Sequence, residues 1–128
     1  MRLLIDAHSL IWALDDPSRL SVVAASALQD PANQLLLGTG TVWELSIKVG
    51  LKKLALSLPL RPWLEKAITD LGLNLLPITL DHAERQAMLP FHHRDPFARL
   101  LAAQAMIEKV SIVSADAILD QYGIHRVW

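Results

Sequence analysis

The chain has 128 residues, of which 52% are hydrophobic and 20% are charged, and it contains no cysteine. This composition predicts one folded domain over residues 1–128, excludes disulfides and thiolate metal sites, and is compatible with a reducing cytoplasm, where we expect the protein. The formal net charge of −1 gives no overall attraction to nucleic acid, so any such contact must come from a local basic patch. Asp6 and His8 interrupt the apolar start, which makes it too polar for a signal peptide or a membrane span.

Short apolar runs alternate with longer helical patterns along the chain. In chain order, we expect a strand at 2–5, a helix at 18–31, a strand at 34–38, helices at 41–50 and 60–72, a strand at 73–78, helices at 79–89 and 96–109, a strand at 110–115, a helix at 116–123 and a strand at 124–128. The strands are continuously apolar, which is typical of a parallel sheet buried on both faces. We therefore predict an α/β fold with a parallel sheet of about five strands and helices on both faces.

Four carboxylates are predicted to reach the carboxyl edge of this sheet, where sites form in open parallel α/β folds. Asp6 and Asp116 directly follow strands. Glu44 lies near the start of the helix after the second strand, and Asp95 opens a helix that should run antiparallel to the strands. Each aspartate taken alone is better explained as a helix cap. Glu44 is an acid in an otherwise apolar turn, and it should be paired or functional.

Clustered carboxylates repel one another unless a cation neutralises them, and a hard divalent metal does this with oxygen ligands alone. Such a cation, Mg²⁺ by ligand type, can activate a water and hold a phosphate oxygen. Zinc is disfavoured because cysteine is absent, and His92 and His93 lack helical spacing and are interpreted as part of a solvated loop. A dinucleotide fingerprint fails because Trp43 stands where a small residue is required, and the chain has no phosphate loop.

Four stretches carry a further signal: LLIDAHSLIWAL at the start, TVWELSIKVGLKKL in the middle, then LPFHHRDPFARLLAAQA, and IVSADAILDQYGIHRVW at the end. In this order and spacing they resemble the PIN-domain ribonucleases, and among them the VapC-type toxins of bacterial toxin–antitoxin pairs. The resemblance covers nearly the whole chain. It implies a PIN-like three-layer α/β fold, Mg²⁺- or Mn²⁺-dependent cleavage of RNA, a homodimer, and inhibition by a cognate antitoxin.

The resemblance also implies roles for single residues. The implied catalytic acids are Asp6, Glu44, Asp95 and Asp116, and the first, second and fourth of these would hold the metal. Position 98 usually carries the second aspartate of the family's D-P-F-D stretch, a common metal ligand, but this sequence has Ala98. Either a natural lineage lost this ligand or it was replaced, and the intact family pattern around Ala98 favours replacement.

Basic and aromatic residues near the acids are candidate partner contacts. Arg94 and Arg99 are predicted to hold RNA phosphates on either side of the scissile bond, and Lys48 is a further RNA contact, with a solvated helix surface as the alternative. Trp12 and Trp63 are candidates for an apolar groove that binds the antitoxin. Ordinary core packing is the alternative for these two tryptophans.

Three functions compete. The leading hypothesis is a metal-dependent endoribonuclease toxin that cleaves RNA with a metal-activated water, impaired here by Ala98. The second is a catalytically dead PIN module that binds the antitoxin and RNA. The third is a small Mg²⁺-dependent α/β enzyme such as a phosphatase. Ala98 separates the first two hypotheses, and a neighbouring antitoxin gene would separate both from the third.

Overall fold

A computed structural model describes residues 1–128 and contains one five-stranded sheet in the order β3-β2-β1-β4-β5. The strands are β1 (Arg2–Ile5), β2 (Gln34–Gly38), β3 (Asn74–Leu76), β4 (Ser111–Val113) and β5 (Arg126–Val127). All four strand pairs are parallel, and the central β1 lies between β2 and β4. The predicted α/β class with a parallel sheet of about five strands is confirmed.

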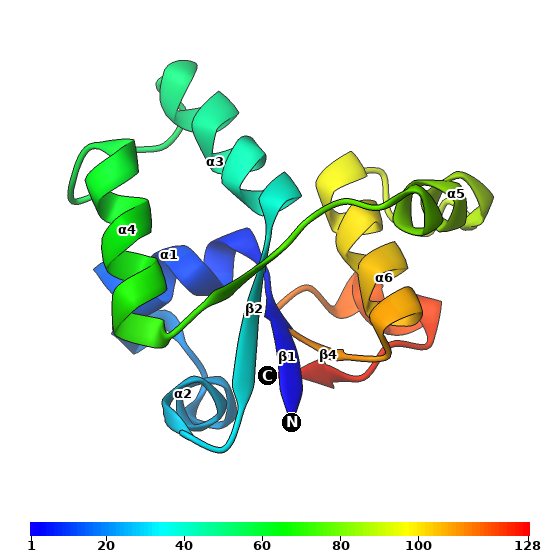
Figure 1. Cartoon of the computed structure of the whole chain (residues 1–128), viewed down its shortest axis with the longest axis horizontal. Helices are drawn as coiled ribbons and strands as arrows, with labels where there is room; N and C mark the ends of the chain where they lie inside the picture. The colour runs from blue at the N-terminus through cyan, green and yellow to red at the C-terminus, as the bar shows by residue number, and fades with distance from the viewer.

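Helices cover both faces of the sheet (Figure 1). They are α1 (Ala7–Asp15), α2 (Val22–Gln29), α3 (Thr39–Gly50), α4 (Leu60–Leu71), α5 (Leu80–Met88) and α6 (Pro96–Glu108), with two short 3-10 helices, η1 (Pro17–Arg19) and η2 (Ala117–Tyr122). Successive strand residues point to opposite faces. Leu3 and Ile5 therefore pack in a core with α1, α2 and α4, whereas Leu4 packs in a second core with α6 and η2. The result is the three-layer arrangement expected from the sequence. No helix combines the length and the apolar character needed to cross a lipid bilayer.

Several element boundaries differ from the prediction for local reasons. The helix expected over 18–31 is divided, because Ser21 interrupts it and caps α2 by accepting a hydrogen bond from the Ala24 amide. The helix expected from Thr41 begins at Thr39, so Thr41 is a buried residue within the first turn. Residues 7–15, which Asp6 caps, form a helix that the sequence patterns did not separate.

Trp63 is fully buried in the core on the α1, α2 and α4 face of the sheet, so the prediction that it lies at an antitoxin groove is wrong. Its indole Nε1 donates to Asp15 Oδ1 at 3.0 Å. Ser57 adds two hydrogen bonds to the same carboxylate, from its Oγ at 2.6 Å and from its amide at 3.0 Å. Partial burial opposes the ionisation of Asp15, but these hydrogen bonds outweigh it and lower the pKa of the carboxyl group. Asp15 thereby ties the end of α1 to α4 and to the loop before it.

Candidate active site

The structure brings the four predicted acids to one cavity of about 40 Å³ at the carboxyl edge of the sheet, whose lining includes Asp6, Glu44, Asp95, Ala98 and Asp116. Asp6 and Asp116 follow the neighbouring strands β1 and β4. Glu44 comes from the second turn of α3, and Asp95 caps the start of α6. Figure 1 places the starts of α3 and α6 at the same end of the sheet as the start of α1. The parallel topology therefore assembles residues that are separated by as much as 110 positions in the chain.

Asp6 is buried and both of its carboxylate oxygens are hydrogen-bonded. Oδ1 accepts from the Ser9 amide at 2.8 Å and caps α1, and Oδ2 accepts from Ser114 Oγ at 2.5 Å. Ser114 Oγ also accepts from the Asp116 amide at 3.0 Å. The fully buried Ser114 thus joins two of the acids. Sequence reasoning missed this serine, whose only signal is its place at the end of β4, two residues before Asp116.

Glu44 is buried and forms an ion pair with Lys48 one helical turn later, with 2.6 Å between Lys48 Nζ and Glu44 Oε2. The expectation that this acid is paired agrees with this contact. Lys48 was predicted to contact RNA, and the structure directs its ammonium group to the acidic cavity. The Lys48 side chain keeps 38% of its surface exposed, so its charge also faces solvent.

His93 lies between two of the acids, so the interpretation of its loop as solvated is wrong for this residue. Its imidazole is only 13% exposed, and its Nε2 is 2.5 Å from Asp116 Oδ2. Its Nδ1 accepts a hydrogen bond from the Asp95 amide at 3.1 Å. The carboxylates of Asp95 and Asp116 each cap the helix that they precede, by accepting from an amide two residues later.

Ala98 is buried and lines the same cavity as the acids, one turn into α6. Its side chain ends at a methyl group, so α6 offers no ligand to the cavity at this position. A carboxylate at position 98 would enter the space shared by Asp6, Glu44 and Asp116. Position 98 therefore borders the acidic cavity, and the role of this position as a ligand site in related sequences stays a prediction.

Arg99 is not available to RNA, and the prediction that it binds phosphate is corrected by the structure. It is 6% exposed, and its guanidinium Nη1 donates to the carbonyl of Pro90 at 2.8 Å and to Tyr122 Oη at 3.3 Å. Nη2 donates to the carbonyls of Gln86 and Leu89. Arg99 therefore holds the end of α5 and the following turn against α6. Arg94, by contrast, is exposed and has no ion-pair or hydrogen-bond partner.

The donor chemistry of the cavity fits a hard divalent cation, because four carboxylates offer oxygen ligands and cysteine is absent. The acids are not preassembled as a metal cluster, since no three acidic or histidine side chains are grouped closely enough to hold an ion. The reason lies in the contacts above: Asp6 faces Ser114, Glu44 faces Lys48 and Asp116 faces His93. Lys48 contacts only Oε2 of Glu44, so the other carboxylate oxygen of this acid has no protein partner.

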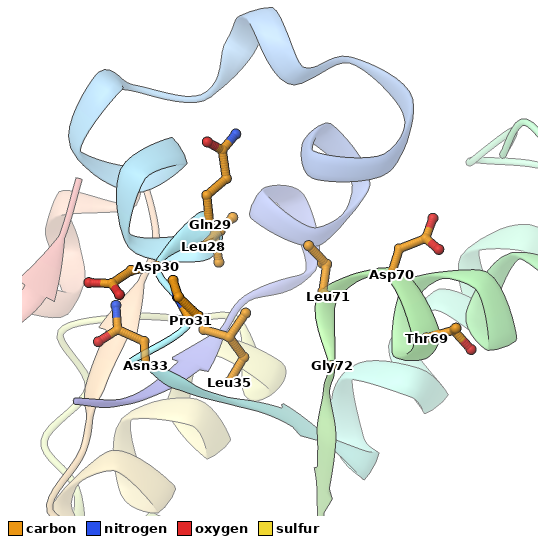
Figure 2. Close-up of a pocket in the computed structure, with 10 residues that line it drawn as sticks. All are labelled: Leu28, Gln29, Asp30, Pro31, Asn33, Leu35, Thr69, Asp70, Leu71 and Gly72. Carbon is orange, nitrogen blue, oxygen red and sulfur yellow. The ribbon is translucent and has the colours of Figure 1, made fainter.

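Two other cavities lie outside the acidic site. The largest, about 590 Å³, lies between the ends of α2 and α4 at the opposite, amino edge of β2 and β3 (Figure 2). Its charged side chains are Asp30 and Asp70, and it contains no cationic or aromatic group. A cavity of about 330 Å³ beside Lys48 is lined partly by Trp12, which is half-buried and packs between His8 and Trp128. Trp12 as an antitoxin contact stays a prediction.

The fold and the acidic edge together define an α/β protein whose candidate site is a set of carboxylates at the end of a parallel sheet. The PIN domain family model matches residues 3–124, and the chain belongs to this family. The family expected from the sequence motifs is thereby confirmed.

Two solved structures are similar in fold. VapBC2 from Rickettsia felis, bound to a DNA fragment from their promoter, matches with a TM-score of 0.70 and 12% identity, covering 98% of this chain and 97% of that chain. FitAcB from Neisseria gonorrhoeae matches with a TM-score of 0.63 and 17% identity, covering 97% and 95% of the two chains. At these identities the likeness is one of fold. No curated protein sequence matches the chain significantly.

Proposed function

We propose that the chain is a metal-dependent endoribonuclease toxin of a toxin–antitoxin pair, formed by the single domain 1–128 and impaired by Ala98. The observation that carries this proposal is the gathering of four carboxylates around one cavity of a PIN domain, with Ala98 facing the same cavity. No residue of this site specifically supports the third hypothesis, a phosphatase.

In this proposal Asp6, Glu44 and Asp116 hold Mg²⁺ or Mn²⁺. When bound, such a cation lowers the pKa of a coordinated water and neutralises charge on the scissile phosphate. The chain's own groups prepare the site. Ser114 fixes the Asp6 carboxylate, since its hydroxyl donates to Oδ2. Lys48 offsets the negative charge of Glu44, which lines the cavity.

RNA would reach the cavity from the side on which Arg94 is exposed, one residue before Asp95. Because Arg99 is buried, Arg94 and Lys48 are the remaining candidates for binding RNA phosphates. Sequence-specific recognition of RNA usually targets unpaired nucleotides, so a single-stranded RNA is the substrate to test.

The similarity to VapBC2 supports an antitoxin as a protein partner, with Trp12 as the candidate contact that is still partly accessible. We extend the family's homodimer to this chain as well. Light scattering of the purified chain at micromolar concentration tests the dimer. Co-purification with a co-expressed antitoxin, compared between the parent and Trp12→Ala, tests the contact.

A second candidate is a catalytically dead PIN module that binds an antitoxin and RNA. Ala98 favours it, and so does the absence of a preassembled metal cluster. It differs from the first in one measurable respect, because a dead module cleaves no RNA at any concentration of divalent cation.

The decisive experiment compares RNA cleavage by the parent, Ala98→Asp and Ala98→Asn with Mg²⁺ and with EDTA. We expect Ala98→Asp to raise the Mg²⁺-dependent rate at least about tenfold, which corresponds to about 1.4 kcal/mol of additional transition-state stabilisation. Asparagine is the matched control because it has almost the same shape without the charge. Equal rates for the parent and both variants, or cleavage that persists in EDTA, would contradict the proposal.

A further inference from the structure

We propose that His93 is a positioning residue of the acidic site, which fixes the carboxylate of Asp116 and joins it to the start of α6. The inference rests on the proposed function, since it assigns to Asp116 the role of a cation ligand. Nothing in the sequence pattern points to this histidine, because it belongs to a polar stretch, HHRD, without helical spacing. Its role follows from the contacts of its two ring nitrogens.

The hydrogen bonds of His93 select one tautomer of the imidazole. Nδ1 lies 3.1 Å from the Asp95 amide nitrogen, which can only donate, so Nδ1 must present its lone pair. The proton of the neutral ring is then on Nε2, which lies 2.5 Å from Asp116 Oδ2. The ring thus accepts from the residue that begins α6 and donates to the acid that follows β4.

The backbone around His93 is fixed as firmly as the ring. The His93 amide donates to Tyr122 Oη at 3.0 Å, and the same hydroxyl donates to the Pro90 carbonyl at 2.9 Å. Tyr122 is buried at the end of η2. His93 therefore connects the loop before α6 to the helix that follows Asp116, and its side chain has little freedom to turn away from that acid.

Both oxygens of Asp116 have a protein partner as a result. Oδ1 accepts from the Ile118 amide at 3.1 Å, and Oδ2 accepts from His93 Nε2. Each carboxylate oxygen keeps a second lone pair, so these bonds set the orientation of the carboxylate without using up its capacity as a ligand. Groups that orient a metal ligand in this way typically affect cation affinity by about 10–100-fold when they are removed.

The adjacent His92 gives a matched control. It is exposed, it has no hydrogen bond to any acid, and it contacts Tyr122 only by an edge-to-face packing of the rings at 5.1 Å between centroids. A change of imidazole to amide at His92 alters the same loop by the same chemistry without touching Asp116.

The experiment measures Mn²⁺ affinity by calorimetry, with no RNA present, for the parent, His93→Gln, His93→Asn and His92→Gln. The glutamine amide nitrogen reaches the place of Nε2 and keeps the donor to Asp116, whereas asparagine is too short and keeps only an acceptor for the Asp95 amide. We expect His93→Asn to weaken Mn²⁺ binding about tenfold or more. His93→Gln should recover most of that loss, and His92→Gln should match the parent.

Unfolding in urea without metal identifies a variant that fails to fold, and the ¹⁵N resonances of the His93 ring supply a second readout. The Nε2–H tautomer is expected in the parent. Mn²⁺ affinity of His93→Asn equal to that of the parent, or a parent ring with its proton on Nδ1, would overturn the role of His93. A parent that binds no Mn²⁺ would instead overturn the cation site, and the carboxyl ¹³C resonance of Asp116 then tests the contact. The Asp116 resonance should shift in His93→Asn and should keep its parent position in His93→Gln. An Asp116 resonance that shifts in neither variant would overturn the inference.

Discussion

Arg99→Lys should destabilise the fold strongly although it keeps the positive charge. The two terminal nitrogens of the Arg99 guanidinium divide four acceptors between them, three backbone carbonyls and the Tyr122 hydroxyl, at 2.8–3.3 Å. A lysine ammonium is a single point and cannot serve both pairs. Loss of the two bonds on one nitrogen, at about 1.5–3 kcal/mol for each bond to a charged group, gives a cost of about 3–6 kcal/mol. A domain of this size has a total stability of about 5–15 kcal/mol, so the variant should lie close to unfolding.

The assay is urea unfolding followed by tryptophan fluorescence, paired with RNA binding in EDTA by fluorescence anisotropy. Arg94→Lys and Arg94→Ala are the controls, because Arg94 is exposed and lies five residues before Arg99, in the loop that leads into α6. The Arg94 variants should unfold within about 0.5 kcal/mol of the parent, and Arg94→Ala should bind RNA more weakly. Arg99→Lys should be strongly destabilised, and the fraction of it that stays folded should bind RNA as tightly as the parent does. An Arg99→Lys protein as stable as the parent but deficient in RNA binding would refute the reasoning, since the guanidinium would then have to face solvent.

Three further outcomes are expected. In EDTA, Ala98→Asp should melt at a lower temperature than the parent, because a fifth acid at the cavity adds repulsion. In Mg²⁺ it should melt at a higher temperature than the parent, because cation binding stabilises the folded state. Equal shifts of the melting temperature in both buffers would contradict the placement of residue 98. The fold lowers the pKa of Asp15 from its usual 3.8. The ionised carboxylate therefore contributes its full stabilisation above pH 3.8, and this contribution is lost as the pH falls through the lowered pKa. In acid titrations of unfolding, the stability advantage of the parent over Asp15→Asn should shrink below pH 3.8. Gly72 has φ +63° with open space around it, so Gly72→Ala should cost about 1 kcal/mol in urea unfolding, whereas Gly50→Ala should cost nothing measurable.

The parallel sheet and its acidic edge could be predicted because both depend on features that are visible along the chain. Continuous apolar runs indicate strands buried on both faces, and the carboxyl ends of parallel strands share one edge whatever the details of packing. Asp6 and Asp116 follow such runs directly, so their meeting did not require any knowledge of side-chain positions.

Exposure could not be predicted in the same way, because it depends on what covers each helix. In α6 all residues from Ala98 to Ala105 are buried, so a charged residue in this stretch must find its partners inside the protein, as Arg99 does with backbone carbonyls. Trp63 likewise lies in the core, where its indole nitrogen donates to Asp15 at the end of α1. His93 was missed for a different reason, since its partners Asp95 and Asp116 meet it only through the turn that leads into α6.

The central position of β1 also sets the order in which the acidic cavity can form during protein synthesis. β1 can pair with β2 once about the first third of the chain has been made, but its other neighbour, β4, begins only at Ser111. After Asp6, 108 further residues must be synthesised before Ser114 can donate its hydrogen bond to Asp6. At a synthesis rate of about 5–20 residues per second, that interval is about 5–20 s. Under the proposed function, the acidic site therefore stays incomplete throughout that interval, in which the growing chain is attached to the ribosome, a particle composed largely of RNA.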